Sequence, residues 1–168
     1  MTLIKSSDRE VAPGIFMSLS SIYNKAYRPE QAQKVIKLIQ TAYPIIKREL
    51  GLTKPVKFRI GPIKAKGVKG RYTNHDRSIA IDQRFDLQSI LKTIAHELVH
   101  AKQYESGDLS WNGVASCWKG RTYGNATTYA AYRALPWEAE AFALQSVLAL
   151  KVIDEVGADL IGTKVVRF

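Results

Sequence analysis

Residues 87–105, LQSILKTIAHELVHAKQYE, place two histidines inside a strongly amphipathic segment of this 168-residue chain. Apolar residues recur there every three or four positions, which predicts an α-helix with one buried face. These residues are Leu87, Ile90, Leu91, Ile94, Leu98 and Ala101. Asp86 immediately precedes them and is a preferred helix N-cap. His96 and His100 lie four residues apart, so they project from the same face of the predicted helix.

Two imidazoles one helical turn apart can bind the same metal ion. Residues at this spacing are about 5–6 Å apart at Cβ, and zinc binds histidine nitrogen at about 2.0–2.1 Å. Glu97 is rotated by one residue, so it can flank the ion and act as general base and then general acid toward a metal-activated water. The alternative is a helix with two satisfied histidines and a surface glutamate. Because histidine and glutamate are costly to bury without a metal or partner, HELVH predicts one zinc ion with Glu97 as the catalytic residue.

A catalytic zinc ion usually has three protein ligands and one position open to water. No histidine follows His100, and His75 lies in a predicted turn, where a solvated role is expected. The single cysteine, Cys117, excludes a Cys-rich zinc site and lies in a loop rich in aromatic residues. Glu138 and Glu140 remain as candidates, because they open a second predicted helix that can pack against the first. Acidic residues are also favoured in a first helical turn without any metal.

HELVH followed by a glutamate on a later helix resembles the gluzincin metallopeptidases, particularly their small single-domain forms. In several such families the third ligand opens an E-x-x-A segment, and Glu138 and Ala141 fit that pattern. The segments HELVHAKQ and PWEAEA are also similar to SprT-like and phage-encoded metallopeptidases. The resemblance covers roughly residues 55–150. It implies a zincin-like fold, Glu138 as third ligand with Glu140 as the alternative, and substrates among DNA-associated proteins.

The chain departs from these families at two points. SprT-like proteins commonly use a third histidine as a ligand, which this chain lacks. The related E-x-x-A-D pattern has an aspartate where this chain has Phe142. A carboxylate that orients a ligand histidine must therefore come from elsewhere in the chain.

The remaining patterns predict an α+β fold. Residues 29–50 show helical spacing, with Pro29 in the first turn and Pro44 expected to kink or split the helix. Three strand-like segments follow, of which the last two flank the turn sequence NHDR as a hairpin. They span residues 56–60, 67–73 and 78–85. A long loop over 106–135 with a hairpin in ASCWKGRTYG precedes a helix that begins at Pro136 and ends before Gly157.

We therefore predict an N-terminal helix, a small and mainly antiparallel sheet of about three to five strands, the HExxH helix, a long loop or hairpin, and a C-terminal helix that carries the third ligand. Residues 1–28 show no strong period and are expected to be irregular. Residues 29–168 are expected to form a single zincin-like metallopeptidase domain. A chain of this length can bury a sufficient core.

Four residues in the loop before Glu138 are candidates for stabilising the oxyanion of a peptide-hydrolysis transition state. They are Tyr123, Tyr129, Tyr132 and Arg133. Each also has a packing role as its alternative. A loop of this length in a small domain is often a lid or binding surface, and its strand edge could hold an extended peptide.

The formal net charge is +10, and basic residues concentrate in residues 54–77, where Asp76 is the single acid. The candidate nucleic-acid contacts are Lys57, Arg59, Lys64, Lys66, Lys69 and Arg71. Lys54 and Arg77 belong to the same cluster. Such a sheet could bind nucleic acid or attract acidic substrates. The alternative is a solvated outer face, and the segment has few aromatic residues on which bases could stack.

The leading hypothesis is a monomeric zinc endopeptidase that acts on proteins or peptides. A DNA- or assembly-associated binding protein with a structural or vestigial zinc site is the second, and a non-proteolytic zinc hydrolase is the third. We expect no signal peptide, because the first residues have scattered charges and no continuous apolar stretch. The longest apolar run, residues 141–153, is too short to span a bilayer. With one cysteine, we expect a cytoplasmic protein, in the host cytoplasm if it is phage-encoded.

Overall fold

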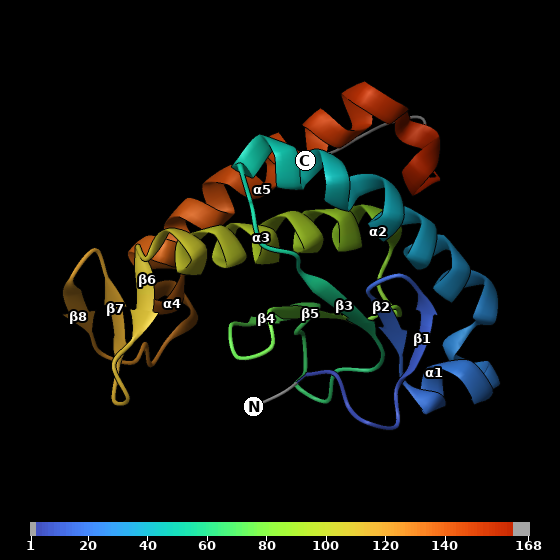
Figure 1. The fold of residues 1–168 in the computed structure, drawn as a ribbon, viewed down its shortest axis with the longest axis horizontal. Helices are drawn as coiled ribbons and strands as arrows, with labels where there is room; N and C mark the ends of the chain where they lie inside the picture. The colour runs from blue at the N-terminus through green and yellow to red at the C-terminus, as the bar shows by residue number, and fades with distance from the viewer. Residues whose placement is uncertain (1–2, 163–168) are drawn as a thin grey trace.

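The computed structural model describes residues 3–162, which form an α+β fold. Three long helices lie over one face of a five-stranded sheet (Figure 1). They are α2 (Pro29–Leu50), α3 (Leu87–Ser106) and α5 (Pro136–Val156). The α+β class predicted from the sequence is confirmed, and residues 163–168 of the predicted domain lie outside the described residues.

The main sheet has the strand order β1-β2-β3-β5-β4 and is mixed. Its strands are β1 (Arg9–Ala12), β2 (Ile15–Met17), β3 (Lys57–Ile60), β4 (Gly70–Thr73) and β5 (Ser78–Ile81). The β1–β2 and β4–β5 pairs are antiparallel, whereas β3 is parallel to both of its neighbours. The predicted hairpin around NHDR is confirmed as β4–β5, and β4 forms one edge of the sheet.

The expectation that residues 1–28 are irregular is wrong. This segment forms β1, β2, the short helix α1 (Leu19–Tyr23) and the 3-10 turn η1 (Lys25–Tyr27). The apolar residues Ile15 and Met17 share one face of β2 and are buried. Their period-2 pattern is only three residues long, so it is too short to identify a strand from sequence alone. Its pairing with β3, forty residues away along the chain, supplies the missing information.

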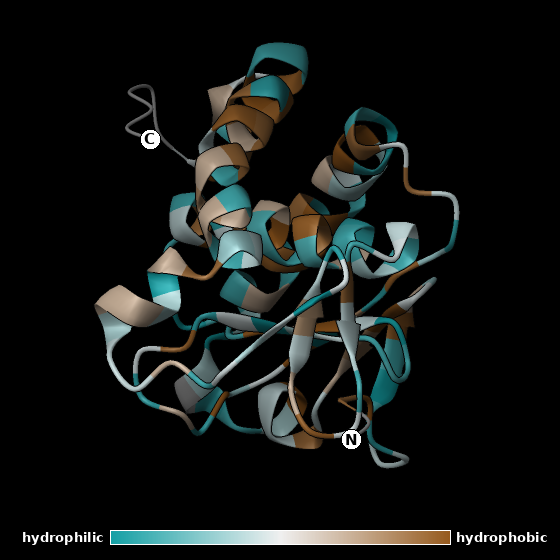
Figure 2. Cartoon of the chain, turned by 90° about the vertical axis from the view of Figure 1, so that its left-hand side faces the viewer, coloured by the Kyte–Doolittle hydropathy of each residue, from teal (hydrophilic) through white to brown (hydrophobic). Residues whose placement is uncertain are grey.

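The long helices begin and end where their sequences indicate. Asp86 caps α3 by accepting a hydrogen bond from the Ser89 backbone N–H at 2.8 Å. Helix α2 continues through Pro44 and is not split. Proline removes one backbone hydrogen bond, but the buried residues Ile39 and Ile46 hold the helix against the core on both sides of it. Figure 2 shows hydrophobic and hydrophilic residues alternating around the helices.

Helix α3 lies in the middle of the core, where it contacts α2, α5 and the sheet. Its apolar residues Ile90, Leu91, Ile94 and Leu98 are fully buried, as the amphipathic pattern predicts. The core therefore fixes the position of the helix that carries the HELVH sequence.

Among the described residues, no helix is long and apolar enough to cross a membrane.

The predicted long loop contains a second, three-stranded antiparallel sheet and a short helix. The sheet consists of β6 (Leu109–Trp111), β7 (Ser116–Trp118) and β8 (Arg121–Tyr123), and α4 (Tyr129–Ala134) follows. The expected hairpin is confirmed as β7–β8. Lys119 and Gly120 at its turn both have positive φ, 47° and 81°, as a two-residue type I′ turn requires. This region lies beside the ends of α3 and α5 (Figure 1).

Candidate metal centre

Helices α3 and α5 bring three potential metal ligands together. The Nε2 atoms of His96 and His100 lie 3.1 Å apart. The carboxylate of Glu138, in the first turn of α5, lies 3.2 Å from His96 Nε2 and 3.4 Å from His100 Nε2. All three residues are at most 8% exposed. Among the described residues, these three form the one cluster of histidine, cysteine or acidic side chains that could hold a metal ion.

The electrostatics of this cluster favour a positive charge. Burial alone would raise the pKa of Glu138, but hydrogen bonds from His100 and His96 lower it to about 2. Burial alone would lower the pKa of His100, but the hydrogen bond to Glu138 and the charges of Glu97 and Glu138 raise it to about 9. A buried anion thus stabilises a cation at this point, which a metal site also requires.

Two glutamine side chains fix the orientation of the two histidines. His96 Nδ1 lies 3.1 Å from Gln145 Oε1, and His100 Nδ1 lies 2.8 Å from Gln103 Oε1. Because an amide oxygen only accepts hydrogen bonds, each Nδ1 carries a proton. A metal ion would therefore bind at Nε2, where it would displace any proton shared with Glu138. These contacts are made by amides where the sequence indicated an unidentified carboxylate. Phe142, at the position of the family aspartate, instead packs edge-on against His96, with ring centroids 4.7 Å apart.

Glu140, the alternative third ligand, lies outside the cluster. Its carboxylate accepts a hydrogen bond of 2.8 Å from Gln103 Nε2, which also donates to the Trp137 carbonyl. Glu140 therefore holds the glutamine that orients His100. The sequence did not reveal Gln103 and Gln145, although each has a simple positional signal: Gln103 lies three residues after His100, and Gln145 lies seven after Glu138 on the same face of α5.

Glu97 is buried beside the cluster without belonging to it. Its carboxylate oxygen Oε2 accepts a hydrogen bond of 2.7 Å from the backbone N–H of Tyr72. Tyr72 belongs to the edge strand β4. The Glu97 side chain is thereby held between α3 and the sheet. It flanks the cluster, as the HELVH sequence predicted.

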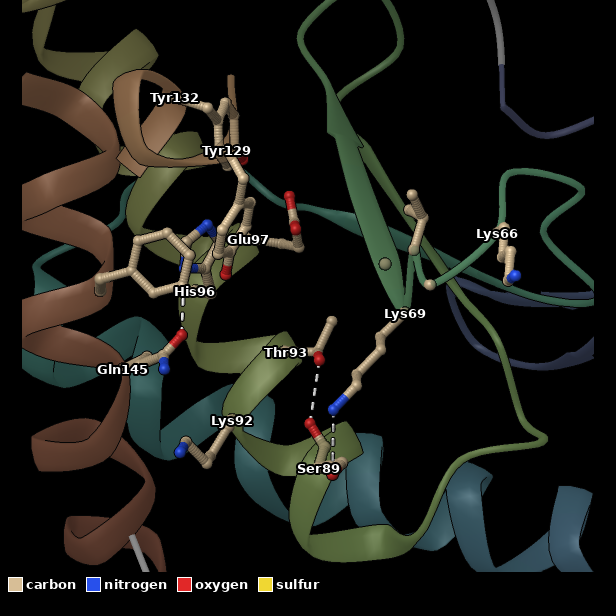
Figure 3. Close-up of a pocket in the computed structure, with 14 residues that line it drawn as sticks. Lys66, Lys69, Ser89, Lys92, Thr93, His96, Glu97, Tyr129, Tyr132 and Gln145 are labelled. Atoms are coloured by element: carbon tan, nitrogen blue, oxygen red, sulfur yellow. Dashed lines mark hydrogen bonds between the residues drawn. The ribbon is translucent and has the colours of Figure 1, made fainter. Parts of the chain in front are cut away.

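The four loop candidates occupy different places. The Tyr132 hydroxyl interacts with the Glu138 carboxylate, and burial raises the pKa of the hydroxyl, so it remains protonated at neutral pH. Tyr129 stacks on Tyr132 (Figure 3). Its side chain is 68% exposed. The Arg133 guanidinium lies over the Phe142 ring at 4.3 Å. Tyr123 packs edge-on against Trp137. Of the four, Tyr132 contacts a cluster residue directly.

Three other residues with side chains that can bind metals, His75, Cys117 and Glu105, lie outside the cluster. His75 is exposed in the β4–β5 turn, as expected. Cys117 lies in β7, with its sulfur 3.5 Å from the Thr122 hydroxyl. Glu105, at the end of α3, accepts hydrogen bonds from Thr53 and pairs with Arg77 at 2.9 Å.

Arg59 is buried in an ion pair, whereas the sequence predicted an exposed basic surface at this position. It lies in the central strand β3, is 9% exposed, and pairs with Asp8 at 2.7 Å. The N-terminal segment covers this face of the sheet, so the alternation of basic residues did not mark an open surface. The remaining basic candidates are exposed: Lys57, Lys64, Lys66, Lys69 and Arg71.

Two adjoining cavities open beside the cluster. One, of about 690 Å³, is lined by His96, Glu97 and Tyr132 together with residues of α5 and the β3–β4 connection. The other, of about 410 Å³, is lined by His100, Glu138 and again Glu97 and Tyr132. Both reach the cluster, so a bound ion would be accessible from outside. Closed structural zinc sites lack such access.

Comparisons with protein-family models, curated proteins and solved structures found no match. The membership of a gluzincin or SprT-like family therefore stays a prediction from HELVH and PWEAEA. The fold and the buried cluster that could hold a metal ion rest on the residues of this chain.

Proposed function

We propose that this chain is a zinc-dependent metallopeptidase that hydrolyses internal peptide bonds. The observation that carries the proposal is the close approach of three potential ligand groups. The Nε2 atoms of His96 and His100 lie 3.1 Å apart, Glu138 Oε2 lies 3.2 Å from His96 Nε2, and Glu138 Oε1 lies 3.4 Å from His100 Nε2. Bonds of about 2.0–2.1 Å to a tetrahedral zinc ion separate neighbouring ligand atoms by about 3.3 Å. The two imidazoles and the carboxylate therefore lie close enough together to bind one such ion.

The chemistry of the donors supports zinc over other ions. Two imidazole nitrogens and one carboxylate oxygen suit zinc, whereas calcium and magnesium prefer sites built from oxygen atoms alone. Three protein ligands leave one tetrahedral position for water or substrate, as catalytic zinc sites do. The two cavities that reach the cluster agree with a catalytic site.

The side chains around the cluster have the roles that peptide hydrolysis needs. A zinc ion, when bound, supplies a Lewis acid that polarises the peptide carbonyl and acidifies water. Glu97 removes a proton from the attacking water and passes it to the leaving amine. The Tyr72 backbone N–H keeps its carboxylate in place. We assign the Tyr132 hydroxyl, which lines both cavities, as the donor to the oxyanion that forms.

The test is Glu97→Gln, with Glu155→Gln as the matched control. Glu155 is an exposed glutamate that pairs with Arg48 far along α5. We expect the Glu97 variant to retain one zinc ion per chain and to hydrolyse an unfolded protein about 10²–10⁴-fold more slowly. The Glu155 variant should keep both properties. Full hydrolysis by a zinc-loaded Glu97→Gln protein would overturn the proposal.

A further inference from the structure

Another cavity lies at the N-terminal end of α3, whereas the metal-binding histidines lie further along that helix. It has a volume of about 500 Å³ and shares no lining residue with the two cavities beside the metal centre. Its walls come from the junction of η1 and α2 and from residues 83–86, which connect β5 to α3. Figure 1 shows the N-terminal ends of α2 and α3 on the far side of the molecule from β6–β8. The proposed peptidase function makes no use of this cavity.

Gln83, which lines this cavity, has an amide oxygen without a hydrogen-bond partner. The residue is 1% exposed, and its Nε2 donates a hydrogen bond of 2.6 Å to the Tyr27 carbonyl. That bond fixes the orientation of the amide, because a carbonyl oxygen cannot donate to Oε1. Among the described residues, Gln83 Oε1 is the one buried side-chain nitrogen or oxygen atom without a partner. An unpaired buried acceptor is costly, so this atom calls for a donor that the chain itself does not supply.

Two arginine side chains line the same cavity. Arg84 donates to the buried Asp82 carboxylate from Nε at 2.9 Å and from Nη2 at 2.6 Å, and Nη2 also donates to the Ile63 carbonyl. Among the described residues, these contacts occupy Nε and Nη2, so Nη1 keeps two N–H donors for a ligand. Arg28 is exposed, immediately precedes α2 and makes no capping hydrogen bond with its side chain. Its φ of +47° is uncommon for a residue other than glycine.

The charges at this cavity favour an anion. Arg84 neutralises the buried carboxylate of Asp82, which lies 2.6 Å from it. Asp86 is the single acidic residue among the described lining residues, and its carboxylate caps α3 and interacts with Lys69. The charge of Arg28 is then left over, so the cavity retains a positive potential.

We propose that this cavity binds a small oxyanion that also carries an O–H donor, such as hydrogen phosphate or an α-hydroxy acid. Arg28 and Arg84 bind the anionic oxygens, as guanidinium groups bind phosphates and carboxylates elsewhere. The O–H group of the ligand donates to Gln83 Oε1, the acceptor that the chain leaves unpaired. The need for a donor distinguishes this site from a basic surface on which any anion collects. The inference does not depend on peptide hydrolysis.

The experiment compares two pairs of probes whose members differ in the O–H donor. Phosphate carries an O–H group at neutral pH and sulfate does not; L-lactate carries one beside its carboxylate and propionate does not. Each probe is titrated into the ¹⁵N-labelled full chain at constant ionic strength, and the amide shifts are followed by NMR. We expect shifts at residues 83–86, with about tenfold tighter binding of the donor-bearing member of one pair. The pair that shows the preference identifies the ligand as a phosphate or as an α-hydroxy acid.

Two variants separate the acceptor from the charge. Gln83→Met has a side chain of similar length without the acceptor, so the two members of the pair should bind equally. Gln33→Met, at an exposed position of α2 outside the cavity, is its matched control and should keep the preference. Arg28→Gly removes a cation where glycine suits the positive φ, and it should weaken binding of both members about tenfold. Lys37→Gln removes an exposed charge of α2 outside the cavity and should leave binding unchanged.

Three results would overturn the proposal. Equal binding of both members of each pair by the wild type would show that Gln83 Oε1 is not used. Shifts confined to residues 96–100 would place the anion at the metal centre. No shift at residues 83–86 with any of the four probes would mean that water alone satisfies Gln83.

Discussion

Two regions form the cleft: the helices α3 and α5, which carry the ligands, and the short helix α4, which flanks them. The two regions differ in how firmly their side chains are held. His96, His100 and Glu138 are buried, and two amides and the hydrophobic core hold them in place. In contrast, α4 has no buried residue, and Tyr129 is 68% exposed. We therefore expect changes to the three ligands and to the amides that orient them to alter metal binding, and changes in α4 to alter turnover alone.

The largest effect should come from removing a ligand. Glu138→Ala takes one of three ligand side chains from the cluster, and we expect zinc affinity to fall by more than about hundredfold, beyond the 10–100-fold typical of outer partners. Glu140→Ala, two residues away, should have the smaller effect of an outer partner, because Glu140 contacts Gln103. Competition with a chromogenic chelator measures both affinities. Equal losses of zinc affinity in the two variants would contradict the assignment of Glu138 as a ligand and Glu140 as an outer partner.

Tyr132→Phe tests the flanking segment. The variant loses a hydroxyl that interacts with Glu138, and we expect kcat to fall by about 10²-fold, as for the loss of one oxyanion donor. Zinc affinity should change little. Tyr129→Phe is the matched control on the same short helix and should retain activity. If Tyr132→Phe lost zinc as readily as activity, α4 would belong to the ligand-bearing region.

Gln145→Ala tests whether the Gln145 amide is needed to orient the His96 ring. The Nδ1 proton of His96 loses its acceptor, and we expect zinc affinity to fall by about tenfold. Gln145→Glu keeps an acceptor at the same place and should restore binding, since carboxylates also orient metal-binding histidines. Unchanged affinity in Gln145→Ala would mean that packing against Phe142 alone orients the ring.

The smallest effect concerns stability at a distance from the cleft. Burial would raise the pKa of Glu105, but hydrogen bonds from Thr53 and Lys54 and the charge of Arg77 lower it to about 2, below the ordinary 4.5. A lowered carboxyl pKa stabilises the fold above pH 4.5, and this contribution disappears as the pH falls from 4.5 to 2.

Accordingly, Glu105→Gln should lower the free energy of unfolding by about 1–2 kcal/mol at pH 7 and by progressively less at pH 4 and pH 3. Urea denaturation at each pH measures the difference from wild type. Glu155→Gln, on the exposed end of α5, is the control and should change little at any pH. If Glu105→Gln lost the same stability at every pH, the effect would come from its hydrogen bonds and not from the charge of the carboxylate.

The sequence predicted those parts of the site that depend on local periodicity. His96, Glu97 and His100 follow from spacing along one helix, and Glu138 followed from a family pattern. The structure separates Glu138 from Glu140 because only tertiary packing of α5 on α3 determines which carboxylate reaches the histidines.

What the sequence missed depends on contacts between distant segments. The strand at Ile15–Met17 is defined by its pairing with β3. Arg59 was taken for a surface residue because its burial partner, Asp8, lies in a segment without a clear pattern. The orienting roles of Gln103 and Gln145 likewise require the packed helices, since glutamine has no intrinsic preference for a metal site.

The central claim is that His96, His100 and Glu138 hold a zinc ion that is used for peptide hydrolysis. The most direct test is the metal content of the purified wild-type protein, measured together with its hydrolysis of an unfolded protein before and after chelation. The account predicts one zinc ion per chain, loss of hydrolysis with the chelator, and its return when zinc is restored. A protein that binds no zinc when the ion is supplied, or one whose hydrolysis is unaffected by complete removal of metal, would contradict it.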